Sequence, residues 1–219
     1  NGCGRTLVDY SKPQTYTPKF LADKILTGRQ SIEGERKLVT VLFADVANYT
    51  AMSEKLDPEE VHQIMDGCFK ILLDEIHRYE GTIDKFTGDG VMALFGAPIA
   101  LEDAPQRAIR SALAIHREIT QFSDRMKQEK GIPAIRMRAG IHTGPVVVGA
   151  LGNDLRVQFT AVGDTVNLAS RLQNLADALV DVTDLLIVER RDVLWIGDHA
   201  VRRAEPRVAG HHAERRLPP

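Results

Sequence analysis

The chain has 219 residues, with 28 Lys and Arg against 30 Asp and Glu, so its formal net charge is −2. This balance argues against a nucleic-acid-binding domain, which has a basic excess, and no apolar run approaches the roughly 18 residues of a membrane-spanning helix. The two cysteines, Cys3 and Cys68, do not make a disulfide framework, and no signal peptide is recognisable. We therefore expect a cytoplasmic protein.

Residues 1–35 are predicted to form an N-terminal segment ahead of the main domain. Its first four residues resemble the end of a zinc ribbon, and we interpret them as a remnant because Cys3 alone cannot build a four-ligand site. Thr17-Pro18 is typical of a helix start and predicts a short amphipathic helix up to about Gly28. This helix either packs against the domain or couples it to an upstream one. We expect additional domains in the full-length protein.

A buried strand is predicted at residues 37–46, because this short run is rich in Val, Leu and Phe. Asp45 lies near its carboxyl end, which is where open α/β sheets usually bind ligands. The small and polar stretch 47–53 follows and opens a helix. Free N–H groups at a helix start suit phosphate groups.

A second stretch, residues 82–96, has two β-rich runs around Gly88-Asp89-Gly90, which predicts a hairpin with Asp89 at its tip. Taken alone, Asp89 is better explained as a turn residue. Beside a second carboxylate at a neighbouring strand end, however, it could hold Mg²⁺, which prefers carboxylate oxygens. The residues by themselves therefore indicate Mg²⁺-dependent nucleotide or phosphate chemistry.

Helical periodicity and alternating patterns place the remaining elements. Two long amphipathic helices are expected at residues 57–79 and 102–128. Beyond them the patterns predict a strand at 135–143, a bend at Gly144-Pro145, a strand at 157–162, a helix from Asp164 and a last strand at 185–188. Residues 201–219 lack apolar periodicity, and we expect 191–219 to be a disordered or atypical tail.

Three segments resemble the signature motifs of the class III nucleotidyl cyclase catalytic domain, in that family's order and spacing: Leu42-Phe43-Ala44-Asp45, Lys85-Phe86-Thr87-Gly88-Asp89-Gly90 and Gly163-Asp164-Thr165-Val166-Asn167-Leu168-Ala169-Ser170-Arg171. The resemblance covers residues 36–190, which we assign to the catalytic domain. It implies an α+β fold, with a ferredoxin-like βαββαβ core sheet and helices packed on one face. The sequence after residue 176 departs from the family pattern.

The resemblance also implies roles for individual residues. Asn167 would orient the ribose, and Arg171 would stabilise charge developing on the phosphoryl group. Lys85 can donate to adenine N1, so ATP is favoured over GTP. The implied metal positions, for two Mg²⁺ or Mn²⁺ ions per active site, are Asp45, Val46 and Asp89, and the implied substrate-binding residues are Lys85, Thr160, Asn48, Tyr49, Thr50 and Arg156.

The activity that the resemblance implies is that of an adenylate cyclase, which converts ATP into 3′,5′-cyclic AMP and pyrophosphate in intracellular signalling. In this family the metal aspartates face the other functional residues across a dimer interface. Because this chain holds both sets, we expect a homodimer. Thr160 is typical of a Thr-bearing subgroup, which makes bicarbonate a candidate regulator. The alternatives are a catalytically degenerate nucleotide-sensing or dimerisation module, a guanylate cyclase, and a diguanylate-cyclase-like or polymerase-palm enzyme.

Overall fold

The structure is a computed structural model, and it describes residues 35–47, 49–153, 156–176, 185–189, 192–197 and 200–204. The predicted N-terminal helix and the zinc-ribbon remnant lie outside these ranges, and so does Asn48. Within the described ranges, no helix has the length and apolar character needed to cross a membrane.

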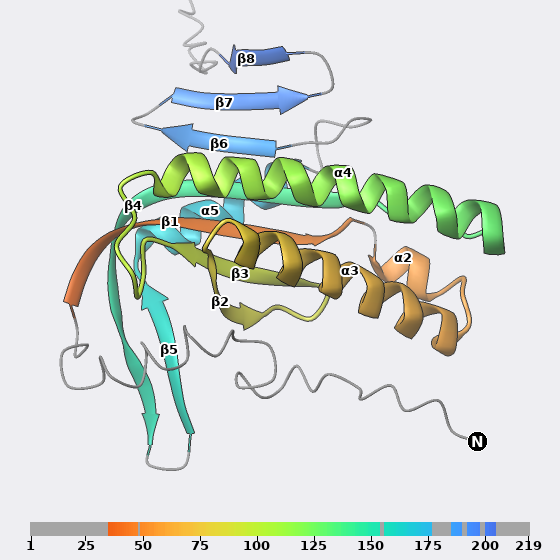
Figure 1. Cartoon of the computed structure of the whole chain (residues 1–219), viewed down its shortest axis with the longest axis horizontal. Coiled ribbons are helices and arrows are strands. Elements are labelled where there is room, and N and C mark those ends of the chain that lie inside the picture. Colours follow the sequence, from red (N-terminus) through yellow and green to blue (C-terminus); the bar gives the residue numbers. More distant parts are fainter. Residues whose placement is uncertain are drawn as a thin grey trace, which may run out of the picture.

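Four strands and two long helices form the centre of the molecule (Figure 1). The strands β1 (Glu35–Val46), β2 (Thr82–Phe86), β3 (Gly90–Phe95) and β4 (Met137–Asn153) lie in the order β2-β3-β1-β4, and each neighbouring pair is antiparallel. Helix α3 (Pro58–Arg78) connects β1 to β2, after the short α2 (Tyr49–Ser53), and α4 (Ala104–Lys130) connects β3 to β4. This is a βαββαβ unit, so the predicted ferredoxin-like α+β fold is confirmed.

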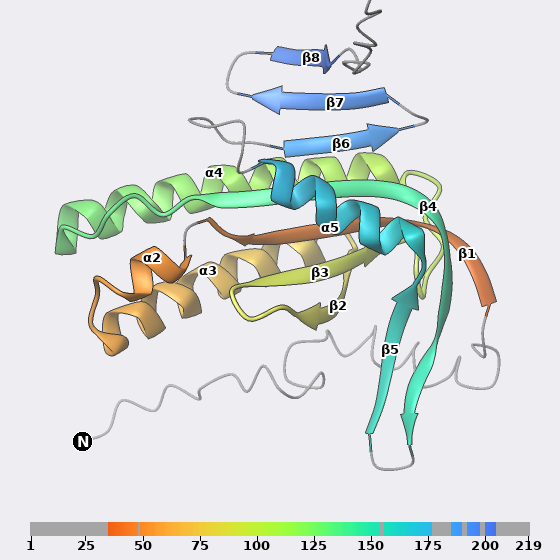
Figure 2. The same ribbon diagram turned by 180° about the vertical axis from the view of Figure 1, so that it is seen from behind.

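Alternation along β1 divides the core between the two faces of the sheet. Leu42, Ala44 and Val46 share one cluster with the apolar residues of α3 and α4, whereas Val39, Val41 and Phe43 belong to a second cluster. That second cluster includes Ala169 of α5 (Asp164–Ala176). The expected packing of helices on one face therefore holds for α3 and α4, while α5 crosses the opposite face (Figure 2).

β4 is longer than the sequence predicts. The strand does not end at Gly144-Pro145, where the sequence predicts a bend: β4 continues through these residues for 17 residues in total, and its ribbon curves strongly between its two halves (Figure 1). Pro145 pairs with Leu38 of β1, and its carbonyl accepts a 2.9 Å hydrogen bond from the Thr165 hydroxyl at the start of α5. The far end of β4 pairs with β5 (Arg156–Val162), and this hairpin extends beyond the rest of the sheet (Figure 1).

Three further strands extend the sheet beyond β4. β6 (Leu185–Glu189) pairs parallel to β4, and β7 (Asp192–Gly197) and β8 (Ala200–Ala204) follow as antiparallel neighbours. β7 and β8 are strands within residues 191–219, so the part of the expected disordered or atypical tail that they cover is not disordered. Short strands such as these are stabilised by pairing with a neighbour, which local sequence periodicity does not reveal. Residues 205–219 lie outside the described ranges.

One buried histidine predicts a pH-dependent stability. His116 on α4 is buried, and burial lowers its pKa to about 4. In the unfolded chain this histidine binds a proton near pH 6.5, whereas in the folded chain it stays neutral down to about pH 4. The free energy of unfolding therefore falls as the pH drops from about 6.5 to about 4, by at most ~1.4 kcal/mol per pH unit. The variant His116→Leu should lack this contribution. Urea unfolding of both proteins at two pH values in this window measures it, and a wild-type-to-variant difference that is independent of pH would contradict the prediction.

Candidate active site

The structure brings Asp45 and Asp89 together at the end of β1. Asp45 pairs in register with Gly90, where an added Cβ would lie 2.2 Å from the Ala44 carbonyl oxygen and 2.5 Å from the Asp45 Cβ. Only glycine fits this contact, which seats the hairpin tip against β1. The Val46 N–H donates to the Asp89 carbonyl over 3.1 Å and fixes the tip further. The two acids thus lie side by side, as the sequence predicts, and their metal-binding role stays a prediction.

Asp45 forms an ion pair that the sequence analysis missed. Arg138 lies opposite Asp45 in the β1–β4 register, and its Nε and Nη2 donate to Oδ1 and Oδ2 over 2.8 Å each. Burial raises the pKa of the Asp45 carboxyl, and the negative charge of Asp89 raises it further, while hydrogen bonds from Arg138 and, more weakly, Gln173 oppose this. Strand alternation puts Arg138 on the same sheet face as Gly140, so the sequence could indicate which face Arg138 occupies. It could not indicate that Asp45 is the partner, because that depends on the register between β1 and β4.

These residues fit a divalent cation by the chemistry of their donors. Asp45 and Asp89 offer carboxylate oxygens, and burial, with a smaller contribution from the charge of Asp89, raises the pKa of Asp45; a divalent cation would favour its ionised form. Val46 has an apolar side chain, so only its main chain could contribute. Across the described ranges, no group of three or more His, Cys, Asp or Glu side chains gathers into a metal site. Water and substrate phosphates would therefore complete the coordination.

Helix α5 packs directly on β4 beside this acidic pair. An added Cβ at Gly140 would lie 2.3 Å from the Gln173 backbone nitrogen and 2.4 Å from the Ala169 carbonyl oxygen. The missing side chain at Gly140 therefore lets the helix backbone approach the strand. Gln173 is buried at this contact, and hydrogen bonding from its side chain weakly lowers the pKa of Asp45, so α5 also reaches the acidic site.

This close approach predicts a large cost for Gly140→Ala. The new methyl group would meet backbone atoms on α5, which cannot rotate away, so the variant should lose roughly 1–3 kcal/mol of unfolding free energy or more. Gly131→Ala is the matched control: Gly131 ends α4 at φ 68° with no atom within 4 Å of an added Cβ, so its cost is only conformational, about 1 kcal/mol. Thermal or urea unfolding compares the two, and an equal or smaller loss for Gly140→Ala would refute the close packing.

Asn167 and Arg171 lie on the other side of α5. They are four residues apart on an α-helix and therefore project from one face, and both are exposed. Leu168 and Leu175 are also exposed, with 37% and 55% of their surface accessible. Within the described part of the chain, no hydrogen bond or ion pair joins Asn167 or Arg171 to the two aspartates. Within one chain, the predicted metal ligands Asp45 and Asp89 are therefore not in contact with the predicted catalytic residues Asn167 and Arg171.

Lys85 lies on β2, two strands away from Asp45. It pairs with Met92, which in turn pairs with Phe43, so Lys85 shares the sheet face of Asp45. Its side chain is partly exposed, and Nζ lies 3.8 Å from Oδ2 of the buried Asp84. The Lys85 ammonium is therefore near a carboxylate but remains accessible to a ligand.

The other predicted substrate-binding residues are described only in part. Tyr49 and Thr50 begin α2, near the end of β1, with Tyr49 packed against the core. Thr160 and Arg156 lie on β5, and Thr160 pairs with Gly149. The side chains of Thr160 and Arg156 lie outside the described structure, and so does Asn48. Their proposed contacts stay predictions.

Comparison with known proteins agrees with this geometry. The family model described as the adenylate and guanylate cyclase catalytic domain matches residues 33–186. The chain is 40% identical over 140 residues to a protein named adenylate cyclase 1 of Rhizobium meliloti (strain 1021), covering 64% of the chain and 21% of that protein. It is 32% identical over 163 residues to an adenylate cyclase of Anabaena cylindrica, covering 72% of the chain and 32% of that protein.

Solved structures show the same fold. The adenylyl cyclase CyaB from P. aeruginosa superposes with a TM-score of 0.66 at 30% identity, over 73% of this chain and 80% of that one. The guanylyl cyclase Cya2 superposes with a TM-score of 0.64 at 28% identity, over 78% and 90% of the two chains. The chain belongs to the adenylate and guanylate cyclase catalytic-domain family. It spans only about a fifth to a third of the length of the two named relatives, 21% and 32%.

Proposed function

We propose that the chain is an adenylate cyclase domain that converts ATP into 3′,5′-cyclic AMP and pyrophosphate at sites shared between two copies in a head-to-tail dimer. One observation supports the shared site above all others: Asp45 and Asp89 converge on one face of the sheet, while Asn167 and Arg171 project from the exposed side of α5. A second copy could bring its α5 to the aspartates of the first. Two equivalent sites would then form in each dimer.

Exposed apolar side chains lie on the other face of the sheet from Asp45 and offer a further surface that a second copy could bury. Val147 on β4 and Val162 on β5 are register partners, 42% and 56% exposed, and Leu38 of β1 is 72% exposed. Alternation along β4 puts Pro145, the partner of Leu38, and Val147 on the same face, so these side chains form one exposed apolar surface. Burying it against a second copy would remove apolar area from water.

The reaction forms a bond between the ribose 3′-oxygen and the α-phosphorus, breaks the bond from that phosphorus to pyrophosphate, and releases the 3′-hydroxyl proton to solvent. Divalent ions, when bound, would make the 3′-hydroxyl a better nucleophile and neutralise charge on the triphosphate. Asp45 and Asp89 would hold these ions. Asn167 would orient the ribose, and the guanidinium of Arg171 would donate to the phosphoryl oxygens as their charge increases.

Lys85 supports ATP as the substrate, because an ammonium donates a hydrogen bond that adenine N1 accepts and that protonated guanine N1 cannot. The test is mass spectrometry of the products after the purified chain is incubated with Mn²⁺ and either ATP or GTP. We expect cyclic AMP and pyrophosphate from ATP in clear excess over cyclic GMP from GTP. Preferred turnover of GTP would overturn the assignment of specificity, and ATP binding without any cyclic product would indicate a degenerate module.

A further inference from the structure

Asp45 and Arg138 form a bidentate and largely buried ion pair. The two residues are direct cross-strand neighbours, so the register of β1 and β4 builds the contact into the sheet. Both guanidinium bonds are 2.8 Å long and each engages a different carboxylate oxygen, which is the bidentate fork that arginine makes with carboxylates. The side chains are only 10% exposed for Asp45 and 18% for Arg138. Solvent therefore screens this pair less than a surface ion pair.

The Arg138 guanidinium lies against the same carboxylate oxygens that a divalent cation would coordinate. Each carboxylate oxygen accepts one guanidinium N–H and keeps a second lone pair, so a cation can approach these oxygens only from the side that the guanidinium leaves open. The guanidinium also repels the cation, because it has a positive charge at contact distance from the same oxygens. Asp89 partly counters this repulsion, since its negative charge acts on Asp45. The positive charge of Arg138 therefore opposes cation binding at Asp45 while the pair is closed.

Two other contacts keep the carboxylate in place when the arginine leaves. Gly90 packs against the Asp45 Cβ on one side, and an added Cβ there would lie 2.5 Å from it. The buried Gln173 side chain approaches from α5, whose backbone is seated on Gly140. Displacing Arg138 therefore changes the partner of Asp45 without releasing Asp45 from its site.

We propose that Arg138 is a built-in electrostatic competitor for the metal: while it pairs with both oxygens of Asp45, its positive charge keeps the affinity of Asp45 for divalent cations low. Arg138 is on this account a positioning residue and not a metal ligand. The inference rests on the proposed function only in taking Asp45 as a metal-binding residue.

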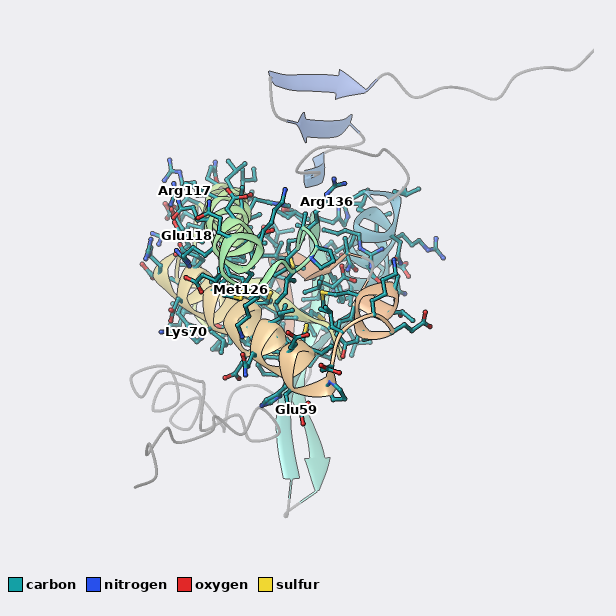
Figure 3. All side chains as sticks on the ribbon, turned by 90° about the vertical axis from the view of Figure 1, so that its right-hand side faces the viewer. Glu59, Lys70, Arg117, Glu118, Met126 and Arg136 are labelled. Atoms are coloured by element: carbon teal, nitrogen blue, oxygen red, sulfur yellow. The ribbon has the colours of Figure 1, made fainter. Side chains whose placement is uncertain are left out.

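Titration of the nucleotide-free chain with Mn²⁺ tests this directly, with free Mn²⁺ followed by electron paramagnetic resonance. Arg138→Gln removes the charge and the fork, and should bind Mn²⁺ roughly tenfold more tightly than the wild type, because a positive charge no longer lies beside the carboxylate. Arg136→Gln is the matched control: Arg136 is exposed two residues earlier (Figure 3), and its variant should bind Mn²⁺ within twofold of the wild type.

Arg138→Lys is the second variant, in case the glutamine variant does not fold. It keeps the positive charge but loses the fork, so its Mn²⁺ affinity should be several-fold tighter than that of the wild type and weaker than that of Arg138→Gln. A residue that only stabilises the fold would change the free energy of unfolding without tightening Mn²⁺ binding. Equal, weaker or undetectable Mn²⁺ binding in the folded Arg138 variants overturns the proposal.

The outcome is separable from that of the proposed function. If the wild type makes cyclic AMP but the Arg138 variants bind Mn²⁺ no more tightly, only the competition fails. If Mn²⁺ binding tightens while the wild type forms no cyclic nucleotide, the competition stands and the cyclase assignment fails.

Discussion

Mixing two inactive variants, Asp45→Ala and Arg171→Ala, is expected to restore cyclase activity. Alone, each variant should lose roughly 1,000-fold or more of its rate, because one lacks a metal carboxylate and the other lacks the guanidinium that stabilises charge on the phosphoryl group. In a head-to-tail dimer of one variant with the other, one site has both defects and the other site has none. With random exchange, half of the dimers are mixed and one site in two is intact, so activity should return to about a quarter of wild type.

This experiment needs evidence that the subunits exchange. Differently tagged variants that co-purify after mixing would supply it, and unfolding curves would show that both variants are folded. A mixture of Asp45→Ala with Asp89→Ala is the matched control, because both lesions fall on the same half-site. Every mixed dimer then has one damaged half-site in each active site, so no activity should return. Exchange without recovery in the first mixture would rule out the shared site.

The second large effect is expected at Lys85. Lys85→Glu replaces a hydrogen-bond donor by an acceptor, which suits the N1–H of guanine and repels N1 of adenine. We expect kcat/KM for ATP to fall roughly 100-fold or more, and the ratio of ATP to GTP turnover to move toward GTP, since sites that hydrogen-bond a substrate discriminate strongly against analogues that lack the matching group. Steady-state kinetics with both nucleotides measures the change.

Lys85→Met separates the loss of the donor from the gain of an acceptor. Its side chain has a similar length and no charge, so ATP turnover should fall without a matching gain for GTP. A Lys85→Glu variant that keeps the wild-type preference for ATP would show that Lys85 does not read the base.

The sequence predicted the parts of the fold that local patterns determine. The long helices begin within two residues of their expected starts, because prolines and apolar stripes mark both of them and an acidic first turn also marks α3. The hairpin around Asp89 was also predictable, since glycine at residues 88 and 90 meets a positive φ and a close backbone contact. Strands β7 and β8 were not, because their stability depends on pairing with β6.

In the candidate site, too, local sequence patterns predicted some residues, and others depend on contacts between distant parts of the chain. Asp45 and Asp89 could be placed side by side from strand ends and turn chemistry, with the family motifs as support. Arg138 could not be assigned to Asp45, because that contact depends on the register between β1 and β4, which are 93 residues apart at this pair. Gln173 was missed for a related reason: its burial follows from α5 resting on Gly140, which no helical pattern reveals.

The most direct test is a crystal structure of the protein with Mn²⁺ and an ATP analogue that lacks the 3′-hydroxyl, with the metals located by anomalous scattering. We expect two metal peaks between Asp45 and Asp89 of one copy and the triphosphate, with Arg171 and Asn167 of the partner subunit at the α-phosphate and the ribose. Metal peaks away from both aspartates, or a nucleotide contacted by Arg171 and the two aspartates of the same copy, would contradict the shared two-metal site.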